Sequence, residues 1–357
     1  MKRAREEVPR TPLEAYVCDV YPAASIVAFL CPPGWCLAPR QRYLARMTIH
    51  NRWHHLKHHE VQRALRDAAS LRQFLLAWQI QTLHAGAYVT SERVYAHSGL
   101  TEKRLARELV LDFDLRDWES QRPSSRALLC ACDAESSCAQ CWMLIDMAAV
   151  ILRTYLGQLR GLGPMLVVFS GKKGAHFYFG TGPTRLLTER QRADLLLHDL
   201  EALRTSMASA PATSMAGRVR EAMMAAWRRH MAARPQLLAA PTAPLSQWLA
   251  ARLQRPVADV TQWAALEART LERVLVPLVA HVAWPVVDQN ALRLNHPVKL
   301  PFSVHAKSGR IALPLAEAAV PTFDPARSPT LAEVLVDPAP VRAGAALLDA
   351  WLADCRA

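Results

Sequence analysis

Four cysteines lie within twelve residues of this chain, and they are half of the eight cysteines in its 357 residues. The four are Cys130, Cys132, Cys138 and Cys141. Four thiolates at this spacing can complete a tetrahedral shell around Zn²⁺, and four protein ligands leave no open position for a substrate. We therefore predict a structural zinc site, a zinc knuckle over residues 130–141.

The cysteine pattern also bears on location. A secreted disulfide-bonded protein spreads its cysteines more evenly and starts with a signal peptide, whereas this sequence starts with the charged segment 1–7. We expect an intracellular, reducing compartment. The best candidate for a membrane span, 23–31, stops at Pro32-Pro33, far short of the roughly 18 apolar residues that a membrane-spanning helix needs, so we expect no membrane partner.

The composition indicates a folded, basic protein. Hydrophobic residues make up 51% of the chain, which excludes disorder for most of it. Lysine and arginine total 43 against 31 acidic residues, a net charge of +12. This excess favours polyanionic partners, with nucleic acid first.

Two carboxylates lie two residues apart in the predicted strand 108–114. Alternation along a strand places Asp112 and Asp114 on the same face. Leu109 to Leu111 are apolar, which indicates a buried strand, and paired carboxylates there need compensation by a cation such as Mg²⁺ or Mn²⁺. The alternative is a polar strand end entering a loop.

Two cationic segments follow in the sequence. Residues 165–179 are predicted to form a hairpin around Ser-Gly-Lys-Lys-Gly-Ala-His, 170–176, whose glycines allow close approach of a ligand and whose cations suit phosphate oxygens. An ordinary solvated turn is the alternative. The second segment, 295–310, is a basic hairpin, preceded by Asp288 at the end of an apolar run, 282–287, that is predicted to be a strand.

The remaining patterns divide the chain into three parts. Residues 1–183 and 281–357 carry the sheet, and 184–280 read as a helical insertion between them. Helices are also predicted at 61–78 and 140–159. The stretch 54–59 contains four histidines, which favour a solvated basic helix face over a metal site; with Arg52 and Trp53 it could instead face nucleic acid or a nucleotide.

Taken in order, these motifs resemble the small, catalytic subunit of archaeal and eukaryotic DNA primases. That family has an Asp-x-Asp strand, a zinc motif ending Cys-x-x-Cys-Trp, a Ser-Gly-Arg-Arg-Gly-x-His motif, and a later Asp before Leu-Lys-x-Pro-Phe-x-Val-His-x-Lys-x-Gly-Arg. The resemblance covers about 108–179 and 288–314. It implies an α/β archaeo-eukaryotic primase (Prim/Pol-like) fold with a mixed sheet, a zinc knuckle and a helical insertion.

The resemblance also implies roles for individual residues. Three carboxylates would hold catalytic Mg²⁺ or Mn²⁺, namely Asp112, Asp114 and Asp288. Seven residues would bind the nucleotide, namely Arg52, Ser170, Lys172, Lys173, His176, Lys299 and His305.

By the same resemblance, the chain would be the catalytic subunit of a DNA-dependent primase. It would use NTPs to synthesise short RNA primers on single-stranded DNA by two-metal nucleotidyl transfer. It would pair with a large primase subunit and associate with a replicative DNA polymerase. The location would be the nucleus in a eukaryote or the host-cell replication site for a virus. Alternatives are a stand-alone primase-polymerase and a non-catalytic zinc module that binds nucleic acid.

The sequence departs from the family in three places. Lys172 and Lys173 replace two arginines, and a lysine offers a point charge in place of a bidentate fork. Ala131 separates two cysteines that are adjacent in the eukaryotic pattern, and the segment 114–130 is longer than usual. None of these changes removes a catalytic carboxylate.

Overall fold

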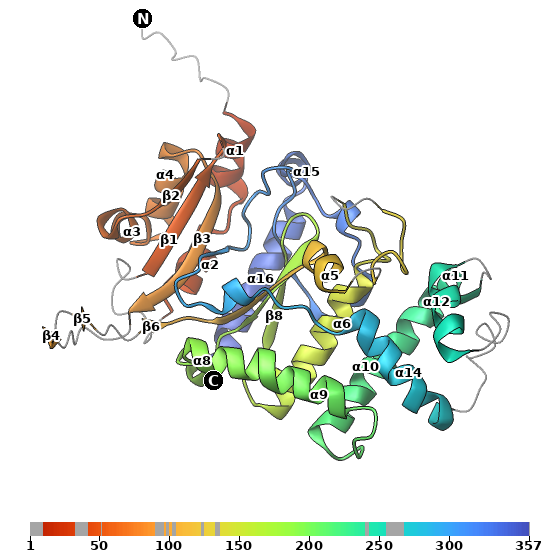
Figure 1. Cartoon of the computed structure of the whole chain (residues 1–357). Helices are drawn as coiled ribbons and strands as arrows, with labels where there is room; N and C mark the ends of the chain where they lie inside the picture. The colour runs from red at the N-terminus through yellow and green to blue at the C-terminus, as the bar shows by residue number, and fades with distance from the viewer. Residues whose placement is uncertain are drawn as a thin grey trace, which may run out of the picture.

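The computed structural model describes residues 10–32, 42–50, 52–89, 96–97, 100–101, 105–122, 125–132, 136–239, 243–254 and 268–356. The charged segment 1–7 lies outside them. Two main sheets organise the described protein, with β1 (Arg42–Thr48), β2 (Trp53–His55) and β3 (Ile80–Val89) at the upper left of Figure 1, β8 (Met165–Phe169) near its middle, and helices around them.

The first sheet is built mainly from the N-terminal part of the chain. Its strand order is β10-β3-β1-β2, and β6 also pairs with β3. The strands are β1 (Arg42–Thr48), β2 (Trp53–His55), β3 (Ile80–Val89), β6 (Leu105–Ala106) and β10 (Val298–Lys299), while β4 (Ala96–His97) and β5 (Leu100–Thr101) pair with each other. Helices α1 (Pro12–Ala15), η1 (Tyr16–Val20), α2 (Ala23–Leu30), α3 (His58–Ala64) and α4 (Ala68–Ala77) belong to the same part of the chain.

The second sheet has the order β11-β8-β9-β7, with β7 (Leu109–Asp114) at one edge. Its other strands are β8 (Met165–Phe169), β9 (Gly174–Phe179) and β11 (Pro314–Leu315). The strands β8 and β9 form the predicted hairpin. Every strand pair in the described residues of both main sheets is antiparallel.

The side chains of β7 alternate between two hydrophobic cores. Leu109, Leu111 and Phe113 pack into a core with the helices that cover one face of the second sheet. Val110 packs into a second core with residues of the first sheet and the N-terminal helices. Asp112 has the same parity as Val110, so its side chain faces the first sheet. Burial on both faces explains why the start of this strand is uniformly apolar.

Helices fill the middle of the chain. Helix α6 (Met143–Leu152) continues as the π-helical segment η3 (Arg153–Leu159), and α5 (Leu115–Gln121) follows β7 directly. The helices α7 (Gly182–Arg185), α8 (Glu189–Ala193), η4 (Asp194–Asp199), α9 (Leu200–Ser206), α10 (Met215–Ala233), α11 (Gln236–Ala239), α12 (Pro244–Leu253) and α14 (Ala268–Ala283) come next, and most of them gather on one side of the molecule (Figure 1).

The C-terminal part returns to the sheets. It contains η5 (Gln289–Leu292), β10, β11, η6 (Glu317–Thr322), η7 (Pro325–Arg327), α15 (Leu331–Val336) and α16 (Ala339–Asp354). Strand β10 joins the first sheet and β11 joins the second, so the segment 298–315 contributes to both sheets.

The α/β class predicted from the sequence is confirmed, although the strands divide between two main sheets. The prediction of a strand at 282–287 is wrong. Helix α14 runs to Ala283, and the valines after it are buried in an extended segment without a strand partner. β-branched residues suit any buried extended segment, so the valines did not distinguish a paired strand from an unpaired extended segment. The helix predicted at 61–78 is two helices, α3 and α4.

None of the described helices has by itself the length and apolar character required to span a membrane. One pair, Pro12–Val20 with Ala23–Leu30, meets the length and composition test only jointly and is bent by 75° at its break.

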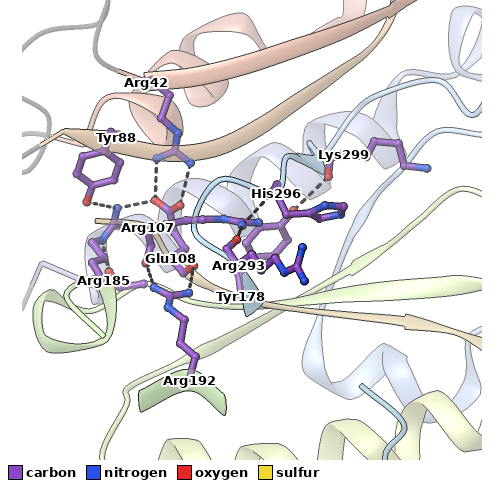
Figure 2. A network of polar contacts seen from close by, with 11 residues as sticks. Arg42, Tyr88, Arg107, Glu108, Tyr178, Arg185, Arg192, Arg293, His296 and Lys299 are labelled. Carbon is purple, nitrogen blue, oxygen red and sulfur yellow. Dashed lines mark hydrogen bonds and ion pairs between the residues drawn. The ribbon is translucent and has the colours of Figure 1, made fainter. Parts of the chain in front are cut away.

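A buried network of charges ties the two sheets together (Figure 2). The Glu108 carboxylate, just before β7, accepts hydrogen bonds from Arg42 of β1 at 2.9 Å and from Arg185 of α7 at 2.6 Å. Burial by itself raises the pKa of Glu108, but the two guanidinium groups outweigh it and hold the pKa at about 2. Arg107 donates to the carbonyls of Arg293 and His296 and so fixes the segment between η5 and β10.

Candidate active site

Asp112 and Asp114 lie at the end of β7, on the face that points toward the first sheet. In the register of β7 with β9, Asp112 is opposite His176 and Asp114 is opposite Gly174. The Asp112 Oδ1 to His176 Nε2 distance is 3.6 Å. Asp114 is also the N-cap of α5, where its Oδ1 accepts a hydrogen bond from the Arg116 N–H at 2.8 Å.

Asp288 reaches the same place through the free edge of β7. Its backbone N–H donates to the Asp112 carbonyl at 3.3 Å. Its side chain caps η5, with Oδ1 accepting from the Asn290 N–H at 2.9 Å. An edge strand offers unpaired backbone groups, and here one of them anchors the third aspartate.

A cleft of about 900 Å³ opens beside these carboxylates. Asp112, Asp114, Ser170, Lys172, Lys173, His176, Lys299 and His305 all line it. Asp288 lines a second, neighbouring cleft of about 690 Å³, and Arg116 lines both. Residues from separate segments of the chain therefore converge on one opening.

The turn 170–173 between β8 and β9 is held by hydrogen bonds from outside it. Lys299 Nζ donates to the Ser170 carbonyl, and Ser308 Oγ donates to the Gly171 carbonyl at 2.6 Å. Ser137 Oγ, beside the cysteine cluster, donates to the Lys172 carbonyl at 2.7 Å. The Leu115 N–H of α5 donates to the Lys173 carbonyl at 3.2 Å.

Gly171 permits the close contact between this turn and the C-terminal segment. Its φ is +96°, and a Cβ added there would lie 2.7 Å from the His305 Cβ. A side chain at this position would meet both a backbone penalty and a clash. The glycine therefore brings the two predicted cationic segments together.

His305 presents a defined hydrogen-bond donor. Its Nδ1 accepts from the N–H groups of Lys307 and Ser308, each at 3.3 Å. In the neutral ring the proton must then be on Nε2. Burial and the nearby lysines lower the pKa of His305 to about 4, so the ring is neutral at pH 7 and can donate through Nε2.

His176 and Lys299 have lowered pKa values next to the carboxylates. Burial, followed by the charge of Lys299, lowers the pKa of His176 to about 3. Its contact with Asp112 is therefore that of a neutral imidazole and not an ion pair. Burial lowers the pKa of Lys299 to about 8, while Asp112 and Asp114 oppose the change.

The carboxylates repel one another in the absence of a counterion. Burial raises the pKa of Asp112 to about 7; Lys299 opposes the rise, and Asp288 and Asp114 add to it. Hard carboxylate oxygens with uncompensated charge suit Mg²⁺ or Mn²⁺. The caps on Asp114 and Asp288 use one lone pair each, which leaves both carboxylates further capacity for a cation.

The cysteine cluster has the geometry of a metal site. The ligand sulfurs of Cys130, Cys132, Cys138 and Cys141 all lie within 4.8 Å of one another. Cys132–Cys141 and Cys138–Cys141 are both 3.8 Å apart, which matches the ~3.8 Å edge of a tetrahedron with ~2.3 Å arms. Within the described ranges this is the single group of three or more His, Cys, Asp or Glu gathered so closely. The three aspartates are neighbours but are not drawn together to this degree.

Arg52 is not brought to the cleft. It lies exposed beside β2, and its carbonyl accepts from the Thr48 N–H. His54 and His55 lie on β2 and not on the predicted helix, which begins at His58, so no pair four residues apart shares a helix face. The histidine stretch is therefore not the predicted helix face.

Thr82, His84 and His296 line the opening but were not predicted as site residues. Trp53 and His55 also line it, and they belong to the stretch for which a position facing nucleic acid or a nucleotide was the alternative prediction. His84 sits within the apolar run of β3, the same signal that singles out His176 in β9, and it could have been found in the same way.

Comparisons with known proteins agree with this geometry. The model of the DNA primase small subunit family matches residues 111–317, which is more than half of the chain. This chain belongs to that family. The matched range begins in β7 and includes all three aspartates, the cysteine cluster and both cationic segments.

Relatives in the family are distant. The Drosophila melanogaster DNA primase small subunit is 22% identical over 276 residues, which cover 66% of this chain and 61% of the relative. The Saccharomyces cerevisiae protein of the same name is 34% identical over 94 residues, 26% of this chain and 21% of the relative. The Caenorhabditis elegans protein is 31% identical over 106 residues, 28% and 24% respectively. The chain thus spans less than two thirds of the length of these relatives.

Among solved structures, the polymerase domain of Mycobacterium tuberculosis ligase D in complex with DNA aligns with 93% of this chain, and 90% of that chain is covered. The TM-score is 0.40 and the sequence identity 13%, so no conclusion about function follows from it.

Proposed function

We propose that this chain is the catalytic subunit of a DNA-dependent primase, which synthesises short RNA primers on single-stranded DNA to start replication. One observation supports this above the others. Two carboxylates from β7 and cations from two distant segments meet at one cleft, and a third carboxylate, Asp288, is anchored to the edge of β7 and lines the neighbouring cleft. A non-catalytic zinc module needs none of this convergence.

The aspartates supply the metal-binding groups of the proposed reaction. Mg²⁺ or Mn²⁺ held by Asp112, Asp114 and Asp288 would activate the attacking 3′-hydroxyl and neutralise charge on the pyrophosphate leaving group. The pKa of Asp112 is raised first by burial, and the charges of Asp288 and Asp114 add to the rise. Asp288 is the N-cap of η5, so the site is complete only when that segment lies against β7.

The cationic residues supply the triphosphate site. Lys172 and Lys173 are positioned by the four hydrogen bonds to their turn, and Lys299 lies between this turn and the carboxylates. The Nε2–H of His305 donates to a phosphate oxygen. Together these groups neutralise charge that develops on the triphosphate during transfer.

The structural metal is proposed to be zinc. Four sulfurs within 4.8 Å of one another, with two pairs at 3.8 Å, suit Zn²⁺, and a closed shell leaves it no catalytic role. Ser137 connects this site to the Lys172 carbonyl, so the zinc site would support the nucleotide turn.

The proposed partners follow from charge and from the family. The net charge of +12 suits a template bound through its phosphates, with affinity that falls as salt rises. We propose a heterodimer with a large primase subunit, associated with a replicative DNA polymerase. We propose that the protein is located in the nucleus in a eukaryote, or at the site of replication in the host cell for a virus.

The test is primer synthesis on single-stranded DNA with NTPs and Mg²⁺ or Mn²⁺, with and without a large subunit. Asp112→Asn, Asp114→Asn and Asp288→Asn should each abolish synthesis while leaving DNA binding nearly unchanged. Asp324→Asn is the matched control, because Asp324 caps η7 through the Ala326 N–H in the same way and does not line the cleft. Primer synthesis by any of the three variants at the unaltered rate would contradict the proposed mechanism.

A further inference from the structure

The nucleotide cleft has two chemically different ends. The cations and carboxylates described above occupy one end. The other end is lined by Met47, Trp53, His55, Thr82 and His84 from one face of the first sheet. A triphosphate would occupy the charged end, and the aromatic end needs a different occupant.

Strand register explains how the aromatic end is built. Across the first sheet, Lys299 is opposite His84, His84 is opposite Ala45, and Ala45 is opposite His55. At ~4.8 Å per strand, this row of four strands extends about 14 Å away from the charged end. Ala45 has only a methyl group, so aromatic side chains on either side of it can approach each other.

Trp53 is exposed yet held in place. Its ring is 4.6 Å from that of His84 and 6.0 Å from that of His55, edge to face in both pairs. Its Nε1–H donates to His55 Nε2 at 3.4 Å, and His84 Nε2 is 3.3 Å from Thr82 Oγ1. Nevertheless 40% of the Trp53 surface remains accessible. An exposed indole fixed by its neighbours is a prepared stacking surface.

We infer that Trp53 stacks on the base of the nucleotide whose triphosphate binds at Lys172, Lys173 and Lys299, with His84 and His55 positioning the indole. This inference rests on the proposed function and adds a base-binding group to it. Stacking uses the π-face that every base has, so all four NTPs should be affected alike.

The experiment compares ATP with inorganic tripolyphosphate as probes, each titrated calorimetrically in Mg²⁺ without DNA. Trp53→Ala should weaken ATP binding by roughly tenfold and leave tripolyphosphate binding unchanged, because only ATP carries a base. Trp53→Phe should restore most of the affinity for ATP. Lys172→Ala should weaken both probes, because it removes a phosphate contact.

Trp78→Ala is the matched control. Trp78 is also an exposed tryptophan, at 48%, but stacks against the Arg46 guanidinium and does not line the cleft. We expect no change with either probe. Unchanged ATP binding in Trp53→Ala would overturn the inference, and so would an equal loss of both probes.

Two further outcomes separate this inference from the proposed function. If Trp53→Ala weakens binding of an oligo(dT) strand and not of ATP, the indole contacts template and the inference is wrong. If the unaltered protein binds neither ATP nor tripolyphosphate, the proposed nucleotide site itself fails, and the inference fails with it.

Discussion

At the scale of single residues, burial sets the chemistry of the cleft. His176, His305 and Lys299 all have pKa values lowered by loss of water, and Asp112 has its pKa raised for the same reason. The imidazoles are therefore neutral donors and acceptors at pH 7. Positive charge near the carboxylates comes from the lysines.

Lys172→Ala should raise the KM for NTP by roughly ten- to a hundredfold, because a charge-assisted phosphate contact contributes ~1.5–3 kcal/mol. Lys172→Arg should retain most of the affinity, since a guanidinium also binds phosphate. Steady-state primer extension with varied NTP measures this. Unchanged kinetics in Lys172→Ala would show that the turn 170–173 does not bind the nucleotide and is an ordinary solvated turn.

At the scale of elements, the turn between β8 and β9 depends on other segments for its shape. Each of its four carbonyls accepts a hydrogen bond from a residue outside the turn. These contacts connect the turn to the cysteine cluster, α5 and the segment 299–308 at the charged end of the cleft. A substitution in any of these parts should therefore change nucleotide binding.

Ser137→Ala should raise the KM for NTP by about two- to tenfold with little effect on kcat, because it removes one neutral hydrogen bond of ~0.5–1.5 kcal/mol. The metal content should stay unchanged, since Ser137 is not one of the four cysteines. Ser137→Thr keeps the hydroxyl and should restore the KM. Nucleotide kinetics together with metal analysis distinguish this positioning role from damage to the metal site.

Cys141→Ser should lower bound zinc and destabilise the protein by on the order of several kcal/mol, because metal binding is coupled to folding. Cys141 is buried and packs in the main core, so the loss should appear in stability before chemistry. Elemental analysis and thermal unfolding measure both effects. Cys355→Ser, outside the cluster, is the control. A metal-free protein of full stability would contradict the prediction.

At the scale of the whole molecule, the two sheets must hold a fixed relation for the cleft to exist. The first sheet contributes Lys299 and the aromatic end, and the second sheet contributes Asp112, Asp114 and the turn. The buried Glu108 network connects them, since Arg42 lies on β1 and Glu108 leads into β7 (Figure 2). Its integrity is a condition for both the fold and the site.

Glu108→Gln should reduce the free energy of unfolding by roughly 3–5 kcal/mol, because it leaves two buried guanidinium groups without their counterion. Arg190→Gln, which breaks an exposed pair with Asp194, should cost less than about 1 kcal/mol. Urea denaturation at pH 7 measures both variants. Equal effects of the two substitutions would show that the buried network contributes no more than a surface pair.

Acid should weaken the same network. The folded-state pKa of Glu108, about 2, is below its ordinary value of 4.5. Its stabilisation is therefore fully present above pH 4.5 and declines as the pH falls toward 2. Urea denaturation between pH 5 and pH 3 should show this decline in the unaltered protein and a smaller one in Glu108→Gln.

The local features of this chain can be predicted from its residue pattern alone. The alternation of β7 and the β8–β9 hairpin depend on contacts close along the chain, so the pattern of their residues is enough to predict them. The cysteine spacing indicated a closed metal site for the same reason. The segment 282–287 was predicted incorrectly, because buried valines do not reveal whether a partner strand is present.

Which distant residues become neighbours depends on tertiary packing. Asp288 joins the aspartates through a hydrogen bond to the edge of β7, and Lys299 joins the turn through β10 of the other sheet. The stacking end of the cleft depends on Trp53 of β2 and His84 of β3, which meet across β1. These contacts join residues far apart in the chain, whose proximity follows from packing and strand register and leaves no local pattern in the sequence.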